Sequence, residues 1–190
     1  MYAEKTNDKF FDDLGRALGK RLTDVQKKSV TAILQAIDEF EISNPNKVAY
    51  ILGTCWHESL FKPIKEIRAK PGTEVWKMQN RYWDSGYYGR GFAQITWRKN
   101  YAKFSAILGV DLVGTPDQAL DVDIAAKILV QGMAQGLFTG VGLDRYFEEG
   151  KPPKWITARK IVNGLFMADK VAKAAVKILA VLVASEQPKT

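Results

Sequence analysis

The chain has 190 residues, 46% of them hydrophobic and five of them tryptophan, so it can bury one sizeable core and is expected to be a single domain. No run of about 18 apolar residues occurs, so no membrane-spanning helix is expected. Segment 1–22 mixes acids and bases and lacks the apolar centre of a signal peptide, so we expect the protein to stay in a cytoplasm until it is released. With one histidine and one cysteine, neither a structural zinc site nor an internal disulfide is expected, and nothing implies a metal or an organic cofactor.

The net charge of +7 is unevenly distributed along the chain. Segment 62–103 carries ten Lys and Arg against three acids, whereas segment 104–150 carries two against seven. Segment 151–190 is basic again, with eight Lys and Arg against two acids. A basic surface of this kind favours a polyanionic partner, and nucleic acid, anionic lipid and a bacterial wall bearing carboxylates all meet that description.

The spacing of apolar residues predicts a succession of helices. Thr23 and Gln26 form a capping box before the first, and Asn46 is the expected cap of a second that ends near Glu58, because Pro63 prevents continuation. Segment 62–91 carries turn signals, and it fits either a short helix or a small hairpin.

Four more helical segments are predicted after this mixed region. They are 97–108, a helix that starts at Thr115-Pro116 and runs toward Gly136, 155–162, and a basic amphipathic helix over 168–185. No internal repeat or linker is present. The expected fold is therefore mainly α and forms one domain over residues 1–190.

Glu58 is the first candidate for chemistry. At the end of an apolar helix, beside Trp56 and Phe61, partial desolvation would raise its pKa and suit it to donate a proton, while the basic stretch downstream would lower that pKa. An ordinary solvated glutamate is the alternative. His57 is assigned a supporting role, because Phe61 stands where a zinc protease needs a second histidine and no Gly-x-Ser-x-Gly motif occurs.

The segment from Tyr87 to Thr96 is the second candidate. Gly89 and Gly91 allow the backbone to approach another group closely, although a tight turn alone would explain them. Aromatic faces and polar groups suited to sugar rings surround these glycines, namely Tyr87, Tyr88, Phe92, Trp97, Gln94, Thr96 and Asn100. The combination predicts a polar cleft of sugar size.

These motifs resemble glycoside hydrolase family 19, which contains chitinases and the phage endolysins that cut peptidoglycan. The resemblance covers roughly residues 25–165 and rests on Trp56-His57-Glu58-Ser59, Tyr87 to Thr96, Asn100-Tyr101, Thr115-Pro116-Asp117 and Ile161-Val162-Asn163-Gly164. It implies an α-helical lysozyme-like fold in which Glu58 is the general acid and Thr96 helps to hold the attacking water. It also implies sugar-binding roles for Tyr88, Gln94, Asn100 and Asn163, with Arg90 and His57 in support.

The second carboxylate is best matched by Glu66. Inverting hydrolysis needs an acid and a base about 6.5–9.5 Å apart across the sugar, and the proline between Glu58 and Glu66 permits such a placement. A solvated partner of Lys65 or Arg68 is the alternative reading of Glu66. Glu74 and Asp84 remain substitutes for the role.

The resemblance favours a phage-type endolysin that hydrolyses β-1,4 links between amino sugars of peptidoglycan, because segment 62–91 is shorter than in plant-type chitinases. A chitinase is the near alternative. A non-enzymatic nucleic-acid-binding protein is a distant alternative. It leaves the Glu58 and Gln94-Ile95-Thr96 combination unexplained, so no nucleic-acid partner is expected.

We expect a monomer that acts after a holin-like partner has given it access to the wall. Helix 168–185 is expected either to pack on the core or to touch anionic lipid or lipopolysaccharide.

Overall fold

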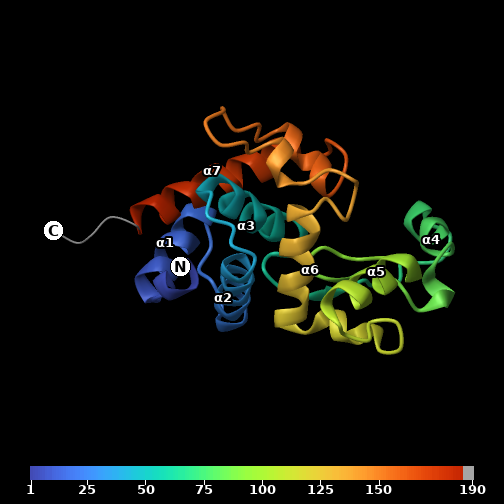
Figure 1. Cartoon of the computed structure of the whole chain (residues 1–190). Coiled ribbons are helices and arrows are strands. Elements are labelled where there is room, and N and C mark those ends of the chain that lie inside the picture. The colour runs from blue at the N-terminus through green and yellow to red at the C-terminus, as the bar shows by residue number, and fades with distance from the viewer. Residues whose placement is uncertain (186–190) are drawn as a thin grey trace.

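The computed structural model describes residues 1–185 and is mainly helical, as predicted (Figure 1). The α-helices are α1 (Asp8–Leu18), α2 (Asp24–Glu39), α3 (Pro45–Ser59), α4 (Glu74–Gln79), α5 (Arg98–Leu108), α6 (Val122–Ala134) and α7 (Ala168–Ala184). The strands are β1 (Ile64–Lys65) and β2 (Arg90–Gly91), and the 3-10 helices are η1 (Ala3–Lys5), η2 (Trp83–Ser85), η3 (Pro116–Leu120), η4 (Leu143–Arg145) and η5 (Thr157–Ile161). Among the described residues, no helix is both long and apolar enough to cross a membrane.

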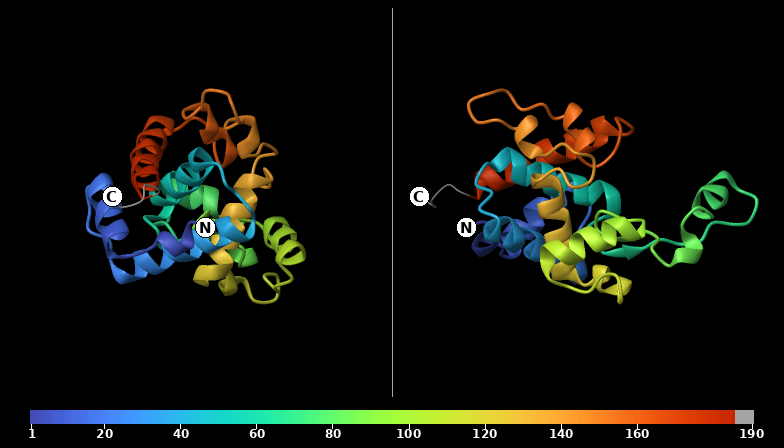
Figure 2. Two further views of the ribbon diagram at one scale, coloured as in Figure 1. Left: turned by 60° about the vertical axis from the view of Figure 1, so that its left-hand side comes forward. Right: turned by 45° about the vertical axis from the view of Figure 1, so that its right-hand side comes forward.

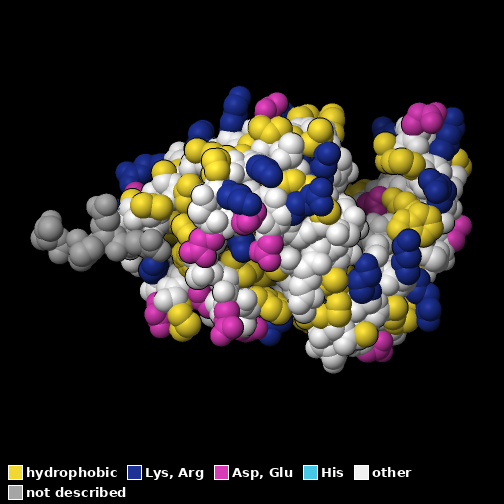
Figure 3. Space-filling view, turned by 45° about the horizontal axis from the view of Figure 1, so that its top comes forward, with side chains coloured by type: hydrophobic (Ala, Val, Ile, Leu, Met, Phe, Trp, Pro, Cys, Tyr) yellow, Lys and Arg dark blue, Asp and Glu magenta, His cyan; other side chains and the backbone are white. Residues whose placement is uncertain are grey.

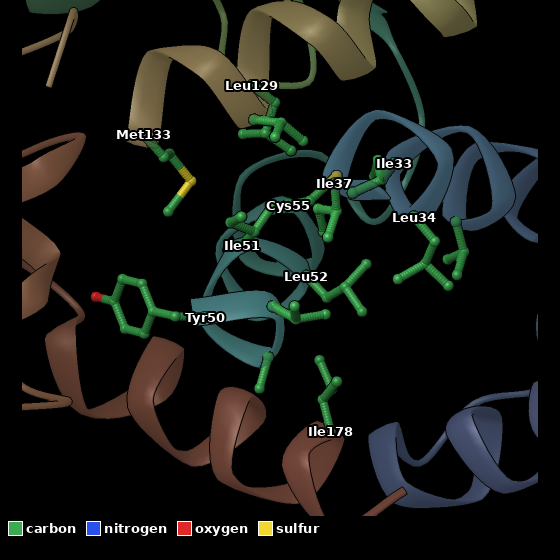
Figure 4. Close-up of a cluster of buried hydrophobic side chains, with 14 of the residues drawn as sticks. Ile33, Leu34, Ile37, Tyr50, Ile51, Leu52, Cys55, Leu129, Met133 and Ile178 are labelled. Carbon is green, nitrogen blue, oxygen red and sulfur yellow. The ribbon is translucent and has the colours of Figure 1, made fainter. Parts of the chain in front are cut away.

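Helix α3 runs through the centre of the main body, with α2, α6 and α7 packed around it (Figures 1 and 4). Its apolar positions are fully buried because three helices cover most of its circumference. The cluster drawn in Figure 4 includes Ile33, Leu34, Ile37, Tyr50, Ile51, Leu52, Cys55, Leu129, Met133 and Ile178. The site described below lies at the C-terminal end of this rigid central helix.

Helix α7 packs along α3 and α1 at the other side of the body. The approach to α3 is close, since a Cβ added to Gly53 would lie 2.9 Å from the Cβ of Ala175. The apolar stripe of α7 is therefore part of the core. Of the two expectations for this helix, the structure shows packing on the core. Lys170, Lys173 and Lys177 remain exposed on its outer face.

Segment 66–88 projects from the body as a lobe that carries α4 and η2 (Figures 1 and 2). The chain enters it through β1 and returns through β2, and these strands pair antiparallel with Ile64 opposite Gly91 and Lys65 opposite Arg90. The mixed segment thus contains both a short helix and a small strand pair, where the sequence had left the choice open. We call residues 66–88 the α4 lobe.

Two predicted helix starts and one predicted helix are wrong. Asn44 caps α3, with Pro45 at its first position, so Asn46 lies inside the helix. Thr115 makes no side-chain cap, and the 3-10 helix η3 follows it. The cap of α6 is Asp121, whose side chain accepts hydrogen bonds from the backbone amides of Asp123 and Ile124. The helix expected over 155–162 is the shorter η5, and α1, capped by Asn7, was not predicted.

Candidate active site

Glu58 lies in the last turn of α3, immediately before a strained turn of the backbone. Leu60 and Phe61 both adopt left-handed conformations, with φ of 52° and 55°. Non-glycine residues rarely hold such angles unless their surroundings enforce them. Here Phe61 is fully buried against Trp56, with ring centroids 5.3 Å apart, and the Leu60 carbonyl accepts a 2.9 Å hydrogen bond from Gln26 Nε2. The turn that ends the helix at Glu58 is therefore fixed by the core.

The carboxylate of Glu58 is paired with Arg159 from η5. Its Oε1 lies 2.6 Å from Arg159 Nη2, and the two side chains are 21% and 3% exposed respectively. Arg159 Nε donates a 3.3 Å hydrogen bond to the Phe166 carbonyl, which ties the following loop to the same guanidinium. The sequence analysis did not identify Arg159, because the pair joins distant segments and no local motif marks it.

Glu66 is held at the root of the α4 lobe by three donors. Its Oε1 accepts hydrogen bonds from Gln79 Nε2 at 2.9 Å and Tyr82 Oη at 2.8 Å, while Oε2 accepts one from the Gly89 amide at 2.8 Å. Since a carboxylate has about four acceptor positions, one position remains open on Oε2. Burial and the neighbouring Glu66 raise the pKa of Tyr82 to about 12, so its hydroxyl remains a donor. Glu66 is thus a fixed carboxylate rather than a freely solvated partner of Lys65 or Arg68.

The two other acids considered for this role lie away from that network. Glu74 is in the first turn of α4 and pairs with Lys77, and its side chain is 87% exposed. Asp84 is exposed on η2. The bonding around Glu66 therefore favours it over both alternatives.

Gly89 and Gln94 form a tight wall beside Glu66. A Cβ on Gly89 would lie 2.8 Å from Gln94 Oε1 and 3.3 Å from Glu66 Oε2, so only glycine fits without displacement. Gln94 has a positive φ of 51°, and its Nε2 donates to the carbonyls of Ile64 (2.7 Å) and Gly91 (3.0 Å). Both of its N–H bonds thus hold the strands together, and Oε1 is the side-chain atom that can accept a further hydrogen bond.

Thr96 and Asn100 continue this wall into α5. The Thr96 hydroxyl donates to the Gln94 carbonyl at 3.1 Å, so its oxygen still has lone pairs that can accept a hydrogen bond from water. Asn100 Nδ2 donates to the Thr96 carbonyl at 2.7 Å. Trp97 lies between them with a φ of 73°, 38% exposed and in edge contact with Tyr82 at 5.2 Å. The strained positions Gln94 and Trp97 fit the tendency of such backbone to occur at functional sites.

Arg90 supports the same wall from inside. Its side chain is buried and donates to Asp117 Oδ1 at 2.6 Å and to the Tyr101 hydroxyl at 2.9 Å. Its guanidinium also lies 4.1 Å from the ring centroid of Tyr88, which stacks on Trp83 with ring centroids 4.3 Å apart. Lys65 and Arg90 together lower the pKa of Asp117, so this carboxylate stays ionised.

The remaining predicted residues lie at the rim or behind the site. Asn163 is exposed after η5, where its Oδ1 accepts a 2.8 Å hydrogen bond from the amide of Gly164. His57 is half-buried beside Glu58, and burial lowers its pKa. Trp97 contacts Tyr82, whose hydroxyl donates a hydrogen bond to Glu66.

A hollow separates the α4 lobe from the main body in the space-filling view (Figure 3). Basic side chains flank it on both sides. A separate surface cavity of about 660 Å³ lies elsewhere, between 40–47 and 148–151, and contains none of these residues.

The helix order and the lobe inserted between two short strands define a lysozyme-like α-helical fold. No protein-family model matches the sequence, and no curated protein matches it. Solved structures that are similar to the chain include two chitinases. A mutant of chitinase C has a TM-score of 0.63 and 18% identity over 97% of this chain and 96% of the other. A bacterial family 19 chitinase has a TM-score of 0.55 and 16% identity over 94% and 95%. The chain therefore has the family 19 chitinase-like fold, as predicted.

Proposed function

We propose that the protein is a glycoside hydrolase of the endolysin type, which cuts β-1,4 links between amino sugars of bacterial peptidoglycan. The observation that carries the proposal is a pair of carboxylates that are each held in place by fixed partners. Glu58 is fixed against Arg159 at the end of a buried helix, and Glu66 is fixed by three donors at the root of the α4 lobe. The shared fold with two chitinases supports a glycosidase.

In this mechanism Glu58 protonates the glycosidic oxygen as the bond from that oxygen to the anomeric carbon breaks. The carboxylate left on Glu58 is stabilised by the adjacent guanidinium of Arg159. A water molecule attacks the anomeric carbon, and its proton passes to the open position on Glu66 Oε2. Thr96 orients this water through its hydroxyl. The sugar configuration is inverted, as expected when acid and base work from opposite faces.

Peptidoglycan is favoured over chitin by charge. Peptidoglycan carries carboxylates, whereas chitin is uncharged, and the surface on and around the lobe carries exposed cations. These include Lys65, Lys70, Lys77, Arg81, Arg98 and Lys99. The two similar structures are chitinases, which supports chitin as the alternative substrate.

Access to the wall and contact with lipid are part of the same proposal. A holin-like partner would release a monomeric enzyme from the host cytoplasm. The exposed lysines of α7 would then meet anionic lipid or lipopolysaccharide by charge alone, because the apolar face of α7 is packed on the core.

Mass spectrometry of the muropeptides released from purified peptidoglycan tests the function. The expected result is a new reducing amino sugar with wild-type enzyme and none with Glu58→Gln. Parallel digestion of chitin oligosaccharides decides the substrate class. Product from chitin alone would establish the chitinase alternative, and full wall lysis by Glu58→Gln would overturn the glycosidase mechanism.

A further inference from the structure

Two polar side chains of α3 share one face of that helix with the candidate acid, Glu58. Tyr50, Thr54 and Glu58 follow one another at intervals of four residues, which places them in a row. Tyr50 and Thr54 are each 1% exposed. Within residues 1–185, the buried hydroxyls of Tyr50 and Thr54 have no hydrogen-bond partner, and Glu58 Oε1 is ion-paired with Arg159 but makes no hydrogen bond.

The Thr54 hydroxyl is unusual among the helix hydroxyls of this protein. Ser29, Thr31 and Ser59 each donate to the carbonyl four residues earlier, at 3.0, 3.1 and 3.1 Å. This bond inside the helix is the ordinary way to satisfy a serine or threonine there. Thr54 does not make it, so its hydroxyl is available to a group outside the helix.

Arg159 faces the same row from η5. Its Nη2 meets Glu58, its Nε meets the Phe166 carbonyl, and its Nη1 is buried with no partner among the described residues. Its positive charge also reaches Tyr50, since it opposes the burial that raises the pKa of that phenol. The guanidinium therefore lies at the Glu58 end of the row, and its positive charge acts on Tyr50 at the other end.

The far end of the row is closed by aromatic rings. Tyr50 packs against Phe147 and Trp155, with ring centroids 5.1 and 6.2 Å apart. Figure 4 shows its hydroxyl pointing away from the apolar cluster formed by Ile51, Leu52 and Cys55. The polar atoms thus face a region that bulk solvent does not reach directly.

Buried polar groups in folded proteins almost always have partners, and internal water supplies them where side chains do not. We propose that Tyr50, Thr54, Glu58 and Arg159 enclose a buried water site on the inner side of Glu58. One water has a place for all four groups: it accepts hydrogen bonds from Arg159 Nη1 and from one of the two hydroxyls, and it donates to Glu58 Oε1 and to the oxygen of the other hydroxyl. Tyr50 and Thr54 are then positioning residues, which act through water on the pair of Arg159 and Glu58.

The site is tested by high-resolution crystal structures of the wild-type protein and of Thr54→Val, which keeps the shape of the side chain. We expect wild-type electron density for an ordered water within hydrogen-bond distance of at least two of the four polar atoms, and loss of that water in the variant. Density without solvent, with the Thr54 hydroxyl bonded to its own helix, would overturn the proposal. This measurement does not use activity, so it remains decisive if the proposed function is wrong.

The positioning role rests on the proposed function and needs kinetics on peptidoglycan. We expect Thr54→Val to lower kcat about 10-fold with KM unchanged and to shift the acid limb of the pH profile, because a displaced acid transfers its proton poorly. Thr31→Val is the matched control, since its hydroxyl bonds within α2 away from the site. Equal kcat and pH profiles in both variants would refute the positioning role. Tyr50→Phe provides a second variant if Thr54→Val fails to fold.

Discussion

The Arg159 guanidinium lies 2.6 Å from the Glu58 carboxylate, although the two residues come from opposite halves of the chain. Arg159 is 3% exposed and Glu58 is 21% exposed, so water screens this contact less than it screens surface ion pairs. The pair joins the end of α3 to η5 and, through the Phe166 carbonyl, to the loop that carries Asn163. One contact therefore links the stability of the C-terminal segment to the geometry of the candidate acid.

Replacing Arg159 with methionine should impair both stability and activity. Removal of one partner leaves a partly buried charge, which costs about 3 kcal/mol, at the low end for buried pairs because Glu58 keeps some exposure. For a chain of this size that corresponds to a fall in Tm of roughly 6–12 °C. Thermal unfolding measures this fall in Tm.

Arg16→Met is the control, because Arg16 also pairs with a carboxylate but is 76% exposed and should contribute at most about 1 kcal/mol. Equal Tm changes in the two variants would contradict this account.

Glu66→Gln separates the favoured second carboxylate from its alternatives. The amide has nearly the same shape but cannot accept a proton from water, so we expect wall hydrolysis to fall about 10²- to 10⁴-fold. Glu74→Gln makes the same chemical change on the exposed face of α4 and should leave the rate close to wild type. Initial rates on purified peptidoglycan provide the comparison. A large loss with Glu74→Gln and none with Glu66→Gln would assign the role of base to Glu74 instead.

The helical fold could be predicted because its signals are local. The capping box at Thr23 and Gln26 is observed with both of its hydrogen bonds, and the apolar spacing of α2 and α3 marks the buried faces. The errors occurred where two local signals competed. Thr115-Pro116 has the composition of a helix start, but the helix begins only after Asp121, because the intervening turn is 3-10.

The site could be predicted only in part. The motif around Glu58 and the segment ending at Thr96 marked the carboxylate and the wall, because these residues are close in sequence. The groups that hold the carboxylates are different. Arg159, Gln79 and Tyr82 reach Glu58 and Glu66 through tertiary contacts, and a glutamine or an arginine in a helix or turn carries no sign of its partner.

Gly89→Ala tests the close fit of the cleft wall. The added methyl would lie 2.8 Å from Gln94 Oε1 and 3.3 Å from Glu66 Oε2, so one of them must move. We expect a loss of about 1–3 kcal/mol in the free energy of unfolding, as for other overpacked sites, together with reduced activity. Denaturant unfolding and initial rates measure the two effects. Gly164→Ala is the control for stability, since its added Cβ meets nothing within 4 Å. Wild-type activity in Gly89→Ala would show that the wall is not tight.

His57 should make stability depend on pH below about 6.5. Burial lowers the pKa of His57, and the charges of Arg159 and Lys170 lower it further, while Glu58 opposes them. In the unfolded chain the pKa returns to about 6.5, so as the pH falls below that value the unfolded state takes up a proton that the folded state resists. The part of the stability that depends on a neutral His57 is therefore fully present above pH 6.5 and is lost as the pH falls through the lowered pKa.

We expect the Tm of His57→Gln to fall less than that of the wild type over this range. His57 is the single histidine of the chain, so the difference in slope is due to this residue. Parallel curves of Tm against pH for the two proteins would show that His57 titrates alike in the folded and unfolded states.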